Sequence, residues 1–139
     1  MAYIPKRIKH RKVHRGKIKG YAQRGNRVSF GDYGLQCLDT GWINGRQLEA
    51  GRVAANRATG GTAKIWIRIF PDKPISSKPA ETRMGKGKGD IDYWAAVVRP
   101  GSIIFELGNV TEDIAKLAFK RVAHKMPVKV RMVKRLPTT

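Results

Sequence analysis

The chain has 139 residues, a length that suits one domain with one hydrophobic core. Its 29 Lys and Arg against 10 Asp and Glu give a formal net charge of +19. Self-repulsion of this size opposes compaction unless a polyanion neutralises it, so a phosphate backbone is the expected partner. No run reaches the roughly 18 apolar residues of a spanning helix, and the N-terminus lacks the apolar stretch of a secretory signal. We therefore expect a cytoplasmic protein without a membrane partner.

Metal, redox and catalytic chemistry find little support in the residue types present. Cys37 is the one cysteine, which excludes an internal disulfide, and burial as a small hydrophobe explains it better than a reactive thiol. His10, His14 and His124 do not complete a zinc site. No serine pairs convincingly with a histidine, and the acidic residues suit turns and helix starts. We predict no enzyme, no catalytic residue, no metal and no cofactor.

The first 27 residues differ in composition from the rest of the chain. They hold 10 Lys and Arg and no acid, and their scattered glycines discourage a long helix. We interpret residues 1–27 as an extended RNA-binding arm, mobile in the free protein, and residues 28–139 as the globular domain. His10 and His14 have a helical metal-ligand spacing, but the cations around them favour RNA contact. The candidate contacts of the arm are Lys6, Arg7, Lys9, His10, Arg11, Lys12, His14, Arg15, Lys17, Lys19, Arg24 and Arg27.

The first elements of the domain follow from apolar spacing and capping residues. Residues 28–38 alternate apolar residues with glycines and predict short strands with bulges or turns. Asn44 and Gln47 form a capping-box pair that starts a helix over residues 45–59, with small residues on its inner face. Its basic residues remain for solvent or RNA, and we count three as candidate RNA contacts: Arg46, Arg52 and Arg57.

Residues 64–70 alternate strictly and predict a strand with Ile65, Ile67 and Ile69 on one face. Trp66 lies on the opposite face, and Trp94 could occupy a neighbouring strand. Either tryptophan could stack on a base, although core packing is favoured. The prolines at 71 and 74 cannot donate to a sheet ladder, so we predict a turn there and a long loop over residues 73–89.

The last third of the chain predicts a hairpin, a helix and a strand. Residues 91–98 and 102–107 should pair as an antiparallel hairpin around the turn at 99–101. Thr111 can cap a helix that ends before Pro127, with a core stripe of Ile114, Leu117, Ala118 and Val122. A strand over residues 128–132 follows. The fold class expected is an α+β sandwich, with two helices against a mixed or antiparallel sheet.

The long loop is the most informative segment for function. It carries five basic residues against one acid, and its alternating glycines and lysines let the backbone approach phosphates closely. The alternative is a solvated hairpin tip. Its spacing matches neither the P-loop nor the dinucleotide-binding fingerprint. The candidate RNA-facing residues of the loop are Lys78, Arg83, Met84, Gly85, Lys86, Gly87, Lys88 and Gly89.

Several short segments also occur together, in order, in one known family. They include Pro5-Lys6-Arg7, Val28-Ser29-Phe30-Gly31, Phe70-Pro71-Asp72-Lys73-Pro74 and Arg83-Met84-Gly85-Lys86-Gly87-Lys88-Gly89. Over nearly its whole length the chain resembles the bacterial large-subunit ribosomal protein L-sixteen family. Departures are modest, such as Gly51 where alanine is usual in that family.

The resemblance implies an α/β-hammerhead fold and a structural role in the large ribosomal subunit. It also implies binding to 23S rRNA near the peptidyl-transferase centre, with the loop directed toward A-site tRNA and P-site tRNA as a further candidate. Neighbouring large-subunit proteins would be partners, and no homo-oligomer is expected. The competing hypotheses are a free RNA chaperone, which would not co-purify stoichiometrically with ribosomes, and an enzyme acting on RNA.

Overall fold

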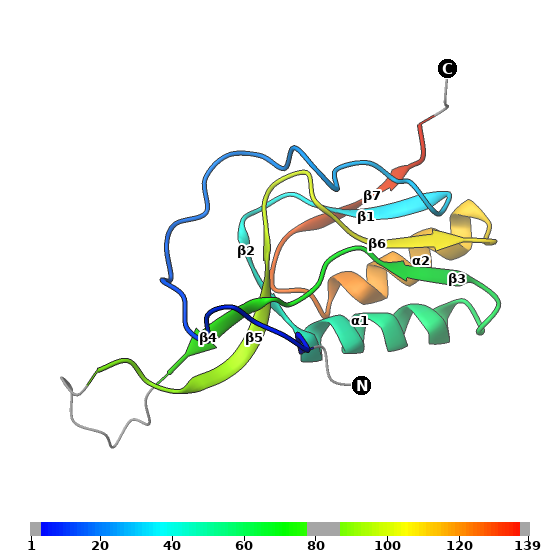
Figure 1. Cartoon of the computed structure of the whole chain (residues 1–139). Helices are drawn as coiled ribbons and strands as arrows, with labels where there is room; N and C mark the ends of the chain where they lie inside the picture. Colours follow the sequence, from blue (N-terminus) through cyan, green and yellow to red (C-terminus); the bar gives the residue numbers. More distant parts are fainter. Residues whose placement is uncertain (1–3, 78–86, 137–139) are drawn as a thin grey trace.

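The computed structural model describes residues 4–77 and 87–136, and in these residues two helices and seven strands form two antiparallel sheets (Figure 1). The four-stranded sheet contains, in spatial order, β3 (Lys64–Ile67), β6 (Ile103–Gly108), β1 (Tyr33–Cys37) and β7 (Val130–Lys134). The three-stranded sheet contains β2 (Gly41–Asn44), β5 (Ile91–Val98) and β4 (Lys73–Ser76). The helices α1 (Gly45–Ala58) and α2 (Glu112–Ala123) pack side by side on one face of the four-stranded sheet. The predicted α+β class is confirmed.

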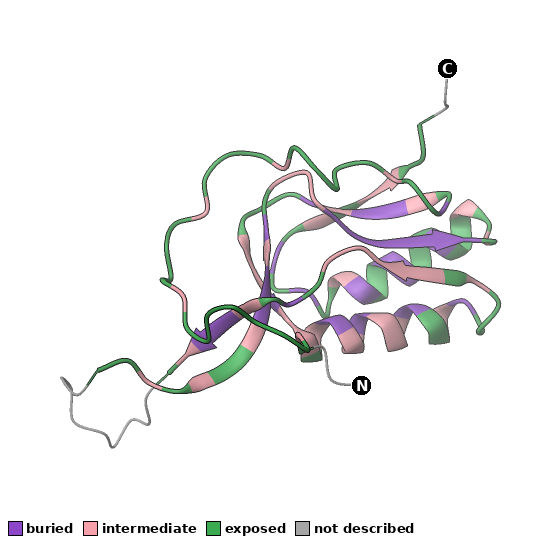
Figure 2. Cartoon of the chain, viewed as in Figure 1, coloured by how far each residue is buried: buried purple, intermediate pink, exposed green. Residues whose placement is uncertain are grey.

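The hydrophobic core lies between the two helices and the four-stranded sheet, where Figure 2 shows the buried residues gathering. Phe105 and Leu107 from β6 meet Leu48 of α1 and Val122 of α2, and all four are fully buried. Burying a side chain of this size contributes about 1.5–3 kcal/mol. Cys37 belongs to the same cluster, which confirms its predicted burial. Burial raises the pKa of its thiol.

The helix α1 begins and ends close to its predicted bounds. The backbone N–H of Gln47 donates to the Asn44 side chain at 2.8 Å, and the N–H of Asn44 donates to the Gln47 side chain at 3.0 Å, which confirms the capping box. Gly51 on the inner face lies so close to the sheet that a Cβ there would be 3.0 Å from the ring of Phe105. The absence of a side chain at Gly51 thus accompanies a close helix–sheet approach.

The predicted β5–β6 hairpin is wrong, because the two strands lie in different sheets. The turn after β5 does form, and Gly101 has a φ of +101°. Beyond it, however, the N–H of Cys37 donates to the Ser102 carbonyl at 2.7 Å and the N–H of Gly101 donates to the Cys37 carbonyl at 2.8 Å. These bonds attach the chain to β1, so β6 pairs with β1 and β3 while β5 pairs with β2 and β4.

Two strands were not predicted, and one of them replaces part of the predicted loop. Lys73–Ser76 is the edge strand β4, with Pro74 opposite Trp94, so the turn at 71–74 and the loop start at 73 are wrong. Proline is tolerated there because one side of an edge strand needs no donor. The other missed strand, β2, directly precedes α1. β3 also ends at Ile67, three residues earlier than predicted.

The predicted core stripe of α2 is half wrong. Ala118 and Val122 are buried, but Ile114 and Leu117 are 41% and 46% exposed, while Ala115 and Phe119 face the core instead. The buried face of α2 is shifted by about one residue from the predicted face. The prediction gave weight to the large apolar side chains of Ile114 and Leu117, which are exposed. Thr111 occupies the N-cap position without a side-chain cap bond, and β7 begins at Val130 rather than 128.

Candidate nucleic-acid interface

The twelve candidate RNA contacts of the N-terminal segment are all exposed. Residues 4–27 contain neither helix nor strand, and Figure 1 shows this segment crossing outside the two sheets before it leads into β1. The side chains that point inward are mainly small or aliphatic, such as Val13, Ile18 and Ala22. The segment therefore presents its cations outward, as an RNA-binding surface requires.

Basic side chains of the domain hold the backbone of this segment. Lys73 of β4 donates to the Arg15 carbonyl, Lys88 donates to the Val13 carbonyl, and Arg99 donates to the Lys19 carbonyl at 3.2 Å. Carbonyl oxygens are the acceptors in each case, so two positively charged parts of the chain are joined without an ion pair.

Two backbone bonds join residues 22–25 to the turn after β5. The N–H of Ala22 donates to the Pro100 carbonyl at 2.9 Å, and the N–H of Ile103 donates to the Gly25 carbonyl at 2.8 Å. Gly25 has a φ of +64°, a backbone conformation that glycine adopts without a Cβ penalty. Main-chain bonds thus fix the position of the segment just before it enters the domain.

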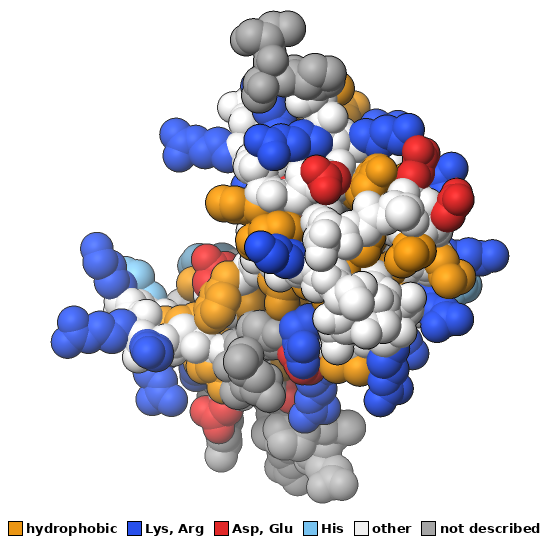
Figure 3. Space-filling model, turned by 90° about the vertical axis from the view of Figure 1, so that its right-hand side faces the viewer, with side chains coloured by type: hydrophobic (Ala, Val, Ile, Leu, Met, Phe, Trp, Pro, Cys, Tyr) orange, Lys and Arg blue, Asp and Glu red, His pale blue; other side chains and the backbone are white. Residues whose placement is uncertain are grey.

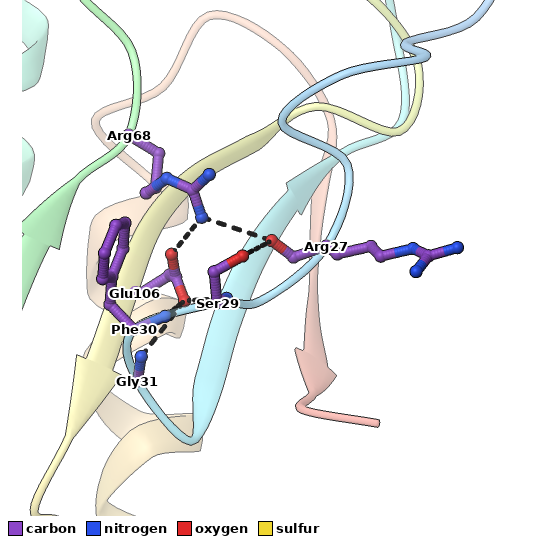
Figure 4. A network of polar contacts seen from close by, with 6 residues as sticks. All are labelled: Arg27, Ser29, Phe30, Gly31, Arg68 and Glu106. Carbon is purple, nitrogen blue, oxygen red and sulfur yellow. Dashed lines mark hydrogen bonds and ion pairs between the residues drawn. The ribbon is translucent and has the colours of Figure 1, made fainter. Parts of the chain in front are cut away.

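The strongest attachment is a buried carboxylate. Glu106 of β6 is fully buried, and one of its oxygens accepts from the N–H groups of Ser29, Phe30 and Gly31 at 2.7, 2.9 and 3.1 Å (Figure 4). Its other oxygen accepts from Arg68, which also donates to the Arg27 carbonyl at 3.2 Å. A buried carboxylate is tolerated when it is paired and fully hydrogen-bonded in this way.

Burial by itself raises the pKa of Glu106, but the bonds from Arg68, Gly31, Phe30 and Ser29 outweigh it and hold the pKa below the ordinary value of 4.5. The carboxylate therefore stays ionised near neutral pH and continues to accept the hydrogen bonds from residues 29–31. Glu106 was not predicted as a functional residue. The available signal was one acidic residue inside an otherwise apolar strand, opposite a strand that continues into Arg68.

Aromatic side chains support the same attachments. Trp66 stacks on Phe30 with ring centroids 6.2 Å apart, so its ring packs against the protein itself, while the Arg68 guanidinium lies 5.0 Å from the Phe30 centroid. Trp42 of β2 lies beneath two cations, with the Lys73 ammonium 4.9 Å and the Arg15 guanidinium 6.0 Å from its ring centroid. Cation–π contacts of this kind contribute about 0.5–1 kcal/mol when exposed.

The other candidate residues fall into three groups. Arg46 and Arg57 of α1 are exposed, whereas Arg52 forms an ion pair with Glu49. Five loop candidates lie outside the described residues: Lys78, Arg83, Met84, Gly85 and Lys86. Gly87, Lys88 and Gly89 are described, and Lys12 donates to the Lys88 carbonyl at 3.1 Å. The C-terminal end of the loop therefore lies beside residues 12–13.

The surface matches this arrangement. In the face shown in Figure 3, Lys and Arg side chains project from the rim and are more prominent than Asp and Glu. Among residues 4–77 and 87–136, no group of three His, Cys, Asp or Glu side chains could hold a metal ion. None of the helices in this part of the chain is long and apolar enough to cross a membrane.

Comparison with known proteins identifies the family. The family described as "Ribosomal protein L16p/L10e" matches residues 5–133. The chain belongs to the L16p/L10e family. It is 62% identical over 135 residues to the large ribosomal subunit protein uL16 of Rhodopirellula baltica, a match that covers 97% of this chain and 98% of that protein. It is 56% identical over 132 residues to the protein of the same name from Heliobacterium modesticaldum, with 95% and 92% covered.

Membership in the L16p/L10e family confirms the resemblance inferred from the short motifs. The family consists of structural ribosomal proteins, so the prediction that the chain is not an enzyme is confirmed as well. The match spans both the basic N-terminal segment and the domain, and the Glu106 network that joins them therefore lies inside the family's matched region.

Proposed function

We propose that this protein is a structural constituent of the large ribosomal subunit in the cytoplasm and binds 23S rRNA. Residues 1–27 form the RNA-binding arm, and residues 28–139 form the domain that positions it. The single observation that carries the proposal is the arm itself. The arm carries ten Lys and Arg and no acidic residue, and its candidate contacts are exposed. It joins the domain next to residues 29–31, whose N–H groups are bonded to Glu106. Phosphate neutralisation by such cations supplies most of the affinity of RNA-binding proteins of this kind.

The finer part of the proposal concerns position. The protein lies near the peptidyl-transferase centre, and its basic loop helps to position aminoacyl-tRNA in the A site, with P-site tRNA as a further partner. Support comes from the motif order and from Lys88, whose contact with Val13 brings the loop end beside the arm. Neighbouring large-subunit proteins are further partners, and the protein acts as one copy rather than as a homo-oligomer.

Sedimentation of a cell extract tests the main proposal. We expect the protein in the large-subunit peak at about one copy per particle, because the arm and the domain together suit a fixed site on rRNA. Quantitative mass spectrometry of gradient fractions gives the ratio. A protein found mainly in the soluble fractions, bound to varied RNAs, would instead be an RNA chaperone and would defeat the proposal.

A triple substitution tests the role of the loop. Replacing Arg83, Lys86 and Lys88 with alanine should impair aminoacyl-tRNA binding while the domain stays folded, because these residues do not belong to the apolar stripes of the sequence. If three phosphates are contacted, the log–log salt slope for RNA binding becomes shallower by roughly 2 to 3 units. Assembly should suffer less, since the ten cations of the arm remain.

The matched control replaces Lys120, Arg121 and Lys125 with alanine, which removes the same charge from the exposed side and C-terminal end of α2. Ribosomes carrying each variant at equal occupancy are compared for aminoacyl-tRNA affinity and peptide-bond formation. If the loop variant equals the control in both measurements, the loop has no role at the tRNA site.

A further inference from the structure

A second basic surface lies where the end of the N-terminal segment meets the strand β7. Arg27 on this surface is one of the predicted RNA contacts, whereas Arg131 and Arg135 are not. A groove runs along the four-stranded sheet between residues 26–29 and the strand β7. Val130 and Met132 of β7 pack toward the core, so Arg131 and Val133 face the opposite side of the sheet from the helices. Arg27 lies in one wall of the groove, and Arg131 and Arg135 lie in the other.

The guanidinium groups in this groove are placed to receive a ligand. Arg131 donates through Nε to the Gln36 side chain at 2.9 Å, a bond that holds the side chain, and Arg131 is exposed. Figure 4 shows the Arg27 side chain pointing away from Glu106, although its carbonyl belongs to that network. Arg135 is exposed, and its backbone N–H donates to the Asp32 carbonyl at 2.9 Å, which fixes the chain just after β7.

The charge in the groove has one sign. None of the described residues that line it is acidic. Lys134, which also lines the groove, pairs with Glu112 of α2 at 3.0 Å. Arginine presents planar pairs of donors that match phosphate oxygens, and the apolar side chains of Val28 and Val133 line the same groove.

We propose that this groove binds the backbone of an RNA strand through Arg27, Arg131 and Arg135. It is a second phosphate-binding surface, which joins Arg27, the last residue of the arm, to Arg131 of β7 and to Arg135, which follows β7. The inference rests on the proposed rRNA-binding function and extends it to β7, where no RNA contact was predicted from the sequence.

The test uses the full-length protein and deproteinised 23S rRNA as the probe. In the double variant Arg131→Gln and Arg135→Gln, the log–log salt slope for binding should become shallower by about 1.4 to 1.8 units, because two phosphate contacts are lost. The matched control, Lys120→Gln and Lys125→Gln, removes two charges from exposed positions in α2 and just after it, and should leave the slope unchanged. Equal slopes for the two double variants would overturn the inference.

A charge-conserving variant separates binding from folding. Arg131→Lys and Arg135→Lys should keep most of the salt slope, and its thermal unfolding midpoint should match that of the wild type. If this variant loses slope and midpoint together, the arginines act in folding and the inference fails. Polyglutamate serves as an acidic-peptide probe, and a groove variant that weakens polyglutamate binding but not rRNA binding also overturns it. A wild type that does not bind 23S rRNA refutes the proposed function itself, whereas equal double variants refute the groove alone.

Discussion

Replacing Glu106 with leucine is expected to lower the free energy of unfolding by about 3–5 kcal/mol, the usual loss when one partner of a buried ion pair is removed. Leucine fills a similar volume but accepts no hydrogen bond. The N–H groups of Ser29, Phe30 and Gly31 would then lose their acceptor, and Arg68 would lose its carboxylate partner. Urea denaturation of the full-length protein measures the change.

Two variants serve as controls for this loss. Glu106→Gln retains one acceptor oxygen for the backbone N–H groups and should therefore cost less than the leucine variant. Glu49→Gln removes a carboxylate from the more exposed ion pair with Arg52 on α1, and a surface pair contributes less than about 1 kcal/mol. Should Glu106→Leu cost no more than Glu49→Gln, the carboxylate would have no special part in holding residues 29–31.

The same site predicts a pH dependence. Because the folded pKa of Glu106 is below the ordinary value of 4.5, the unfolded chain binds a proton more readily. Its stabilising contribution is complete above pH 4.5 and is lost as the pH falls through the folded pKa. The Glu106→Gln variant should lack this part of the acid-induced loss. The free energy of unfolding of the two proteins is measured by urea denaturation from pH 6 downward. An equal loss with falling pH in both proteins would contradict the expectation.

Replacing Arg7, Lys9 and Arg11 with glutamine should weaken binding to 23S rRNA on the order of 100-fold at 0.15 M salt. The log–log salt slope should become shallower by about 2 to 3 units if each residue contacts one phosphate. The unfolding midpoint should stay unchanged, because the three side chains are exposed and lie outside the core.

The matched control for the arm replaces Lys120, Arg121 and Lys125 with glutamine, with the same net charge as a result. Filter binding or fluorescence titration over a salt series gives both slopes. A control that loses as much affinity as the arm variant would mean that total charge, and not the arm, governs binding.

Local signals in the sequence were sufficient for some elements of the fold. The Asn44–Gln47 capping pair marks the start of α1 because both partners lie within four residues of one another. The alternation of Ile65 and Ile67 likewise indicates one face of β3. The separation of β5 and β6 into different sheets could not be obtained in this way. It depends on bonds from Cys37, more than 60 residues away, that draw the chain after the turn into the other sheet.

The residues of the candidate site show the same contrast between local signals and long-range contacts. Unbalanced positive charge predicts the arm and the loop as RNA-binding segments, because charge needs no partner to be recognised in a sequence. The role of Glu106 was not predicted, because it arises from contacts with residues 29–31. The role of Trp42 was not predicted either, because it arises from contacts with Lys73 and Arg15. The groove beside β7 was missed for a related reason. Arg27 and Arg131 form one surface only after β7 pairs with β1.

The strand order of the larger sheet also bears on how the protein is made. β1 is central, yet both of its neighbours, β6 and β7, come from the last third of the chain. During synthesis β1 emerges early and has neither neighbour until residues 103–134 have left the exit tunnel, and such non-local pairing is intrinsically slow. Glu106 also emerges late, so residues 29–31 remain without their carboxylate for most of translation. The cationic arm is thus released first, and RNA can reach it before the domain has closed.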